Sequence, residues 1–195
     1  MAYATRDEIK EEIGIPEADD AADSRIDGLL PIIKAIIDNY THRTFEAEAD
    51  ATRYFDVDRD VCGRMLFFDH DLVSITTVQN GDGNTIPDTE YTFEPRNDFP
   101  KFAMILKGSS TYYWMYTDAG DAEDAIAITG KWAFAETPPD YVRRVAIRLG
   151  HYLYRQPDTA NDLGRSYLTV NATNLPSKLP SDIEMILRDL IPLVY

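Results

Sequence analysis

The stretch GKWAFAETPPDYVRRVAIRLGHYLYR, residues 130–155, decides the fold of this chain. It begins as the end of a strand, two prolines then indicate a turn, and a long amphipathic helix follows. Thr137 is placed to cap this helix through its side chain, and the two prolines after it suit a first helical turn. Apolar residues recur at helical spacing on one face: Val142, Val145, Ala146, Leu149, Tyr152 and Leu153. The pattern predicts a helix that packs on a core through this face.

A second face of the same helix carries cations, which we call the arginine stripe: Arg144, Arg148, His151 and Arg155. Spacings of four, three and four residues place them on one side of about three helical turns. Three interpretations are open at this point. The stripe is a solvated face with local pairs such as Asp140 with Arg144, or it binds an acidic face of a neighbouring subunit, or it contacts phosphates. The charge of the chain disfavours phosphates.

The composition indicates one domain with an insertion, since the chain has 195 residues and 44% of them are apolar. The start of the chain lacks the apolar core of a secretory signal. No run approaches the roughly 20 apolar residues of a membrane span, so no membrane partner is expected. The single cysteine, Cys62, excludes an internal disulfide and a cysteine-based zinc site, and a reducing compartment is expected.

The net charge of −15 is unevenly distributed along the chain. Residues 1–60 contain 16 acidic and 7 basic side chains, and residues 61–135 contain 11 and 5. Residues 136–195 contain 7 of each, so the arginine stripe lies in the neutral third. Such a chain does not bind DNA by neutralising phosphates, although an acidic surface repels the DNA backbone.

Helices are expected on both sides of the residue 130–155 stretch. Capping boxes open the first and the last of them: Thr5 with Glu8, and Ser181 with Glu184. Gly14 is placed to stop the first helix. A second helix is expected over residues 24–40, where Pro31 kinks it or splits it near Gly28. Residues 156–180 are polar and are expected to form a flexible or docking segment.

The middle of the chain changes from helical to alternating periodicity. Strands are expected over these ranges: 53–57, 64–68, 73–78, 90–94, 102–107, 111–117 and 124–132. Asn80-Gly81-Asp82-Gly83 is a strong hairpin signal. The predicted fold class is therefore α+β: a small helical bundle within a single domain of residues 1–195, formed by two N-terminal helices, a long helix near 138–155 and a C-terminal helix, with an inserted antiparallel β unit near 52–132.

The sequence offers no convincing catalytic or metal site. Asp56, Asp58 and Asp60 begin like a calcium loop, but Val61 stands where that loop requires glycine. The three histidines are far apart, and the sequence contains no phosphate-binding loop, dinucleotide-binding fingerprint or serine-nucleophile motif. We therefore expect no enzymatic activity, no cofactor and no metal.

The order of these motifs resembles the head–tail connector (adaptor) proteins of long-tailed bacteriophages and prophages. The likeness is carried by YTHRTF (residues 40–45), NGDG, EYTFEP and the run ITGKWAFAETPPDYVRRVAIRLGHYLYR (residues 128–155). Its most specific residues are these: Thr129, Gly130, Trp132, Phe134, Pro138 and Val142. The resemblance covers most of residues 5–155, and the final helix fits as well.

The resemblance implies a structural protein of the virion neck, made in the cytoplasm of a bacterial host. Such proteins form a homo-oligomeric ring, typically twelvefold, beneath the portal protein. The ring extends the channel through which the genomic DNA passes without specific binding, and it is a platform for the stopper or tail-completion protein.

Two sets of residues are the candidate contacts with subunits or partners: the arginine stripe and the apolar C-terminal residues Leu193, Val194 and Tyr195. The alternatives are another neck or tail-completion protein, or a ligand-binding or glycan-binding α+β module. That module would use a group of aromatic residues: Tyr112, Tyr113, Trp114 and Tyr116.

Overall fold

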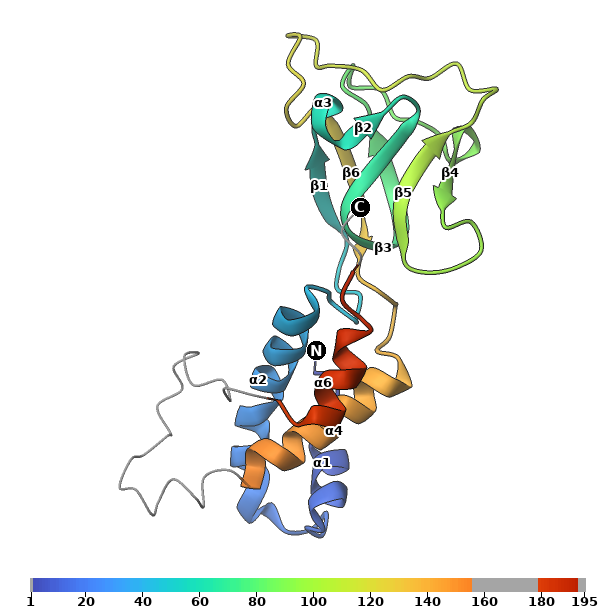
Figure 1. Cartoon of the computed structure of the whole chain (residues 1–195). Helices are drawn as coiled ribbons and strands as arrows, with labels where there is room; N and C mark the ends of the chain where they lie inside the picture. The colour runs from blue at the N-terminus through green and yellow to red at the C-terminus, as the bar shows by residue number, and fades with distance from the viewer. Residues whose placement is uncertain (1, 156–178, 193–195) are drawn as a thin grey trace. The chain divides into compact units, whose positions relative to one another are not determined.

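A computed structural model describes residues 2–155 and 179–192 of the chain (Figure 1). The chain forms two compact units, which we call the helical unit (Met1–Arg43 with Pro138–Tyr195) and the β unit (Thr44–Thr137). Most of the expected docking segment, residues 156–178, and the C-terminal Leu193, Val194 and Tyr195 lie outside the described residues.

Four α-helices and one short 3-10 helix build the described part of the helical unit: α1 (Arg6–Ile13), η1 (Asp20–Ala22), α2 (Asp23–Thr41), α4 (Asp140–Arg155) and α6 (Ser181–Arg188). Helix α4 packs against α1, α2 and α6, so it is the centre of this unit. Its apolar face is buried through Val142, Val145, Ala146 and Leu149, as the periodicity predicted, whereas Tyr152 and Leu153 are only partly buried. The opposing side chains include Ile9 of α1, Ile33 of α2 and Ile183 of α6.

The helix ends at the N-terminus of the chain follow local sequence rules. Thr5 and Glu8 form the predicted capping box, and Gly14 ends α1 with a φ of 85°. Helix α2 continues through Pro31 as one helix of 19 residues, so the chain is not split near Gly28. The capping box predicted at Ser181 is wrong: Pro180 is the N-cap of α6, and it makes no side-chain cap.

The β unit contains an antiparallel sheet with the order β1-β6-β3-β5-β4, and β2 pairs with β3. The strands are β1 (Ala51–Phe55), β2 (Val61–Cys62), β3 (Met65–Gln79), β4 (Tyr91–Glu94), β5 (Lys101–Leu106) and β6 (Ile126–Trp132). Two short helices, α3 (Val57–Asp60) and η2 (Asp88–Glu90), interrupt them. The predicted α+β fold class, with helices and an antiparallel sheet, is confirmed.

Strand β3 joins the two halves of the sheet, because it pairs with β5 near its start and with β6 near its end. The sequence predicted two strands here, over residues 64–68 and 73–78, but they are one strand whose register shifts with each partner. Gly130 of β6 fits this irregular region, since a Cβ there would lie 2.2 Å from the carbonyl oxygen of Ser74. The core of the unit includes Phe55, Leu66 and Ile128.

The strand predicted over residues 111–117 does not form. The segment runs outside the sheet, and side chains bind its backbone in place of a neighbouring strand. The Asn80 amide donates to the carbonyl oxygen of Tyr113 at 2.8 Å and accepts from the Met115 N–H at 3.1 Å. The Arg64 guanidinium donates to the carbonyl oxygen of Tyr112 in this segment, and to three carbonyl oxygens just before it, of Leu106, Lys107 and Ser110. These contacts satisfy backbone groups that a ladder would otherwise pair.

Candidate interaction surfaces

The arginine stripe does not lie free on α4, because half of it binds carboxylates of the same chain. Arg144 forms an ion pair with Glu12 of α1 at 3.1 Å, and it does not use the predicted partner Asp140. Arg148 forms an ion pair with Asp182 of α6. A neighbouring cation outside the stripe, Arg143, binds Glu8 of α1 in the same way. These contacts connect α4 to the helices on either side of it.

The other half of the stripe, His151 and Arg155, lies at the end of α4. Both residues line an open hollow between α4 and the start of α6, which we call the α4–α6 hollow. Its lining residues are Arg148, His151, Tyr152, Arg155, Pro180, Asp182 and Ile183. Within the described residues, Arg155 is exposed and has no ion-pair partner, and the buried Nε2 atom of His151 has no hydrogen-bond partner.

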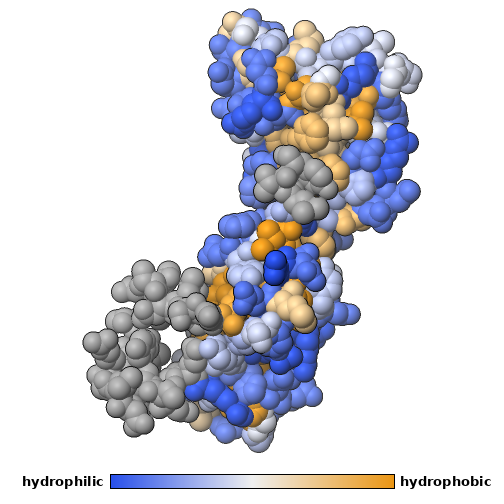
Figure 2. All heavy atoms as spheres, viewed as in Figure 1, coloured by the Kyte–Doolittle hydropathy of each residue, from blue (hydrophilic) through white to orange (hydrophobic). Residues whose placement is uncertain are grey.

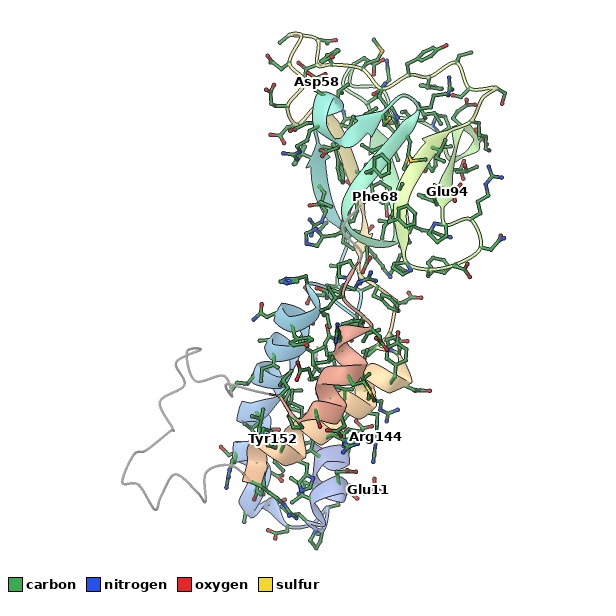
Figure 3. The ribbon with its side chains drawn as sticks, viewed as in Figure 1. Glu11, Asp58, Phe68, Glu94, Arg144 and Tyr152 are labelled. Carbon is green, nitrogen blue, oxygen red and sulfur yellow. The ribbon has the colours of Figure 1, made fainter. Side chains whose placement is uncertain are left out.

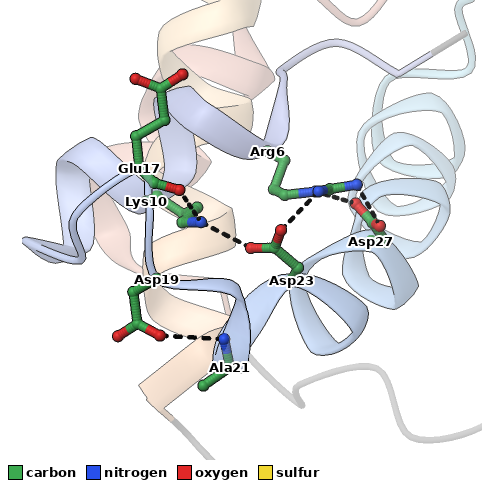
Figure 4. Close-up of polar contacts among 7 residues, drawn as sticks. All are labelled: Arg6, Lys10, Glu17, Asp19, Ala21, Asp23 and Asp27. Atoms are coloured by element: carbon green, nitrogen blue, oxygen red, sulfur yellow. Dashed lines mark hydrogen bonds and ion pairs between the residues drawn. The ribbon is translucent and has the colours of Figure 1, made fainter.

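A buried ion pair holds α1 against the start of α2 (Figure 4). Lys10 is only 1% exposed, and its ammonium donates to Asp23 and to the carbonyl oxygen of Glu17, at 2.7 and 2.8 Å. The hydrogen bond to Asp23 raises the pKa of Lys10, and the same bond lowers the pKa of the Asp23 carboxyl. Arg6 adds two further ion pairs, to Asp23 and to Asp27, both at 2.7 Å. The cluster is therefore internally neutralised, and its role is to hold the two helices together.

Acidic side chains that are not neutralised in this way gather beside that cluster. We call them the acidic edge: Asp7, Glu11, Glu17 and Asp20. All four side chains are exposed, and none has an ion-pair partner within the described part of the chain. The visible surface around α1 is mainly hydrophilic (Figure 2). The helical unit thus carries unmatched charges of both signs, at the acidic edge and at the α4–α6 hollow.

The aromatic residues near position 114 do not form an exposed stacking platform. Trp114 is 8% exposed, and its indole N–H donates to the carbonyl oxygen of Arg64 at 3.1 Å. Tyr112 packs partly buried against the core, and the Tyr116 hydroxyl donates to Asp58 at 2.6 Å. Tyr113 is exposed, with the Arg64 guanidinium 5.2 Å from its ring centre. Tyr116 is exposed as well, so a glycan would find two tyrosines here that already contact Arg64 and Asp58, which does not favour the glycan-binding alternative.

The described residues contain no group of three histidine, cysteine or acidic side chains placed to hold a metal ion. Cys62 lies exposed on β2. None of the described helices is long and apolar enough to span a membrane.

Two residues that organise the β unit escaped sequence reasoning. Arg64 and Asn80 hold the segment of residues 111–117 through contacts with residues more than 30 positions away. The only local signal was at Asn80, which opens the predicted NGDG turn and accepts the Gly83 N–H at 2.9 Å through its own carbonyl oxygen. Nothing in the residues around Arg64 indicates its four carbonyl partners.

With both units described, the chain can be compared with known proteins. No protein-family model matches the sequence, and no curated protein matches it. Among solved structures, the fold is similar to a chain in a structure described as the neck of an empty GTA particle computed with C6 symmetry, where GTA is a phage-like gene transfer agent. The TM-score is 0.59 at 12% sequence identity, over 97% of this chain and 89% of that chain. At this identity, the similarity establishes a shared fold.

Proposed function

We propose that this chain is a structural neck protein of a phage-like particle, a head–tail connector that forms a ring beneath the portal protein. The observation that carries the proposal is the extent of the fold match. It covers 97% of this chain and 89% of a neck chain, so it includes both the helical unit and the β unit. A shared fold alone does not fix function, and the connector motifs in residues 40–45 and 128–155 supply the second support.

The assembly we propose is a closed homo-oligomeric ring. The neck structure with the similar fold was computed with C6 symmetry, which is the symmetry of a ring. A twelvefold ring contains the sixfold operator, so the twelve subunits implied by the sequence resemblance are compatible with that symmetry. The ring would extend the DNA channel and give the stopper and the tail a platform for attachment.

The proposed partners are the portal protein, the stopper or tail-completion protein and further copies of this chain. Genomic DNA would pass through the ring without specific binding, because a net charge of −15 repels phosphates. We propose no catalytic role, cofactor or membrane partner. The chain would be made in the cytoplasm of a bacterial host and would be located in the virion neck.

The direct test is co-expression of the full chain with the portal protein encoded in the same genome, followed by purification and electron cryo-microscopy. We expect a ring of this chain on one face of the portal ring. A chain that stays monomeric at every concentration and does not bind the portal would contradict the proposal. A duplex DNA of random sequence is the matched control ligand, and we expect no binding to it at moderate salt.

A further inference from the structure

The structure divides the arginine stripe into an occupied and an unoccupied half. Arg144 and Arg148 already have carboxylate partners on α1 and α6. His151 and Arg155 have none among the described residues, although they lie within one turn of each other on α4. The cation of the stripe that is able to bind another molecule is therefore Arg155, in the last turn of α4.

The α4–α6 hollow has the chemistry of a site for a carboxylate side chain. Arg155 supplies an exposed guanidinium with several N–H donors, and His151 lines the hollow beside it with its Nε2 atom buried. Tyr152, Pro180 and Ile183 line the hollow beside these polar groups and contact the carbon atoms of an incoming side chain. Arg148 and Asp182 neutralise each other, so the net charge offered by the hollow comes from Arg155.

The complementary surface is on the same unit but on another side of it. The acidic edge has four exposed carboxylates without ion-pair partners in the described chain. Glu11 and Arg144 lie on one side of the helical unit, whereas Tyr152 of the hollow lies on the other (Figure 3). Glu11 therefore does not reach the hollow of its own chain, but the acidic edge of a second copy fits the hollow by charge.

We propose that the α4–α6 hollow of one copy binds the acidic edge of the next copy in the ring, with Arg155 contacting the carboxylates of Asp7, Glu11 and Asp20. This inference rests on the proposed function, because it assigns the contact between subunits of that ring. The contact is heterologous: each subunit uses two different patches, as a closed ring requires. Charge complementarity of this kind fixes which surfaces meet and speeds their association.

The test compares two charge reversals in the full chain, Arg155→Glu and Arg188→Glu, by sedimentation velocity over a range of concentrations. Arg188 is the matched control because it is an exposed arginine of α6 that does not line the α4–α6 hollow. We expect Arg155→Glu to raise the concentration needed for half-assembly by about tenfold or more, and Arg188→Glu to leave it unchanged. High salt should also raise the concentration that the wild-type chain needs for half-assembly, because it screens the charges.

A charge swap makes the inference specific. Glu11→Lys places a cation in the last turn of α1, where the helix dipole favours it, so the helix stays folded. We expect Glu11→Lys alone to weaken assembly and the double variant Arg155→Glu with Glu11→Lys to restore most of it, because each contact then has opposite charges again. Circular dichroism on each variant checks that the helices remain intact.

The outcomes separate this inference from the function on which it rests. If wild-type chain and Arg155→Glu assemble equally well, the hollow is not the contact, while the ring and the proposed function stand. If the wild-type chain forms no ring alone or with the portal, the function is contradicted and the inference with it. If Arg155→Glu and Glu11→Lys each weaken assembly and the double variant does not restore it, the two patches do not meet, and the pairing is wrong.

Discussion

At the scale of single residues, Gly81 shows how closely the hairpin turn approaches the segment of residues 111–117. A Cβ at Gly81 would lie 2.0 Å from the carbonyl oxygen of Met115 and 2.5 Å from that of Tyr116. Both are backbone atoms, so no side-chain rotation relieves the overlap.

We therefore expect Gly81→Ala to destabilise the β unit by about 2 kcal/mol or more, as overpacking does. Tryptophan fluorescence during denaturant unfolding measures this change, since Trp114 lies in the displaced segment. Gly108→Ala is the control, because a Cβ there meets nothing within 4 Å. Equal stability of the two variants would contradict the close approach.

The pKa of Asp23 gives a second prediction at this scale. Asp23 has a lowered pKa in the folded chain, so the unfolded chain binds the proton more readily, and the stabilisation is present above the unfolded pKa. It is lost as the pH falls through the lower folded pKa, in the range below about 4.

We expect Asp23→Asn to lower the melting temperature at neutral pH, because Lys10 then stays buried without its carboxylate. The difference from wild type should shrink as the pH falls below about 4, where wild-type Asp23 also becomes neutral. Thermal unfolding followed by circular dichroism, at neutral pH and at a pH below about 4, checks this. Asp27→Asn, which removes only an ion pair to the exposed side of Arg6, is the control and should have a much smaller effect.

Local roles were predicted well in the first helix, although the capping box at Ser181 was wrong, and residues with long-range roles were not found. Thr5, Glu8 and Gly14 act within one helical turn, so their spacing in the sequence is also their geometry. Arg64 and Asn80 bind backbone atoms that the fold brings to them from distant positions. Such contacts leave no periodic or spacing signal in the chain.

At the scale of elements, α4 depends on a close approach to two neighbouring helices at Gly150. A Cβ there would lie 2.7 Å from Cδ1 of Ile9 in α1 and 3.2 Å from Cδ1 of Ile33 in α2. The absence of a side chain therefore lets three helices meet, although glycine weakens a helix by itself.

We expect Gly150→Leu to destabilise the helical unit by about 1–3 kcal/mol, because overpacking outweighs the gain in helix propensity. Gly28→Leu is the matched control: Gly28 lies in α2, and a Cβ there meets nothing within 4 Å. We expect that variant to be more stable than wild type by about 0.5–1 kcal/mol. Unfolding followed by far-UV circular dichroism measures both, and a stabilising Gly150→Leu would show that the helices do not pack through this residue.

Helices and strands were predicted best where a single hydrophobic periodicity, either helical or alternating, dominates the sequence. The apolar face of α4 and the alternation of β6 were identified, because each repeats over several turns or residue pairs. The segment of residues 111–117 has the aromatic composition of a strand, yet tertiary contacts hold it outside the sheet. The arginine stripe was found by spacing, but its division into two halves depends on where α1 and α6 pack.

At the scale of the whole molecule, the two compact units have separate cores and separate spectroscopic probes. Both tryptophans, Trp114 and Trp132, belong to the β unit, whereas the long helices belong to the helical unit. Fluorescence and far-UV circular dichroism therefore report mainly on different units.

We expect Gly150→Leu to lower the midpoint of the unfolding transition followed by circular dichroism more than the midpoint followed by tryptophan fluorescence. Transitions that do not coincide are the signature of units that unfold separately. Gly81→Ala provides the reciprocal comparison: we expect it to shift the midpoint followed by fluorescence more than the midpoint followed by circular dichroism. Equal shifts at both probes would instead mean that the chain unfolds as one cooperative body.

Cys62 gives each chain one exposed thiol, and the sequence has no other cysteine. A maleimide dye or a heavy-atom cluster can therefore be attached once per subunit without engineering the protein. Counting photobleaching steps in single assembled particles would then count subunits directly. The same label, seen by electron microscopy, would mark the position of every β unit in the proposed ring.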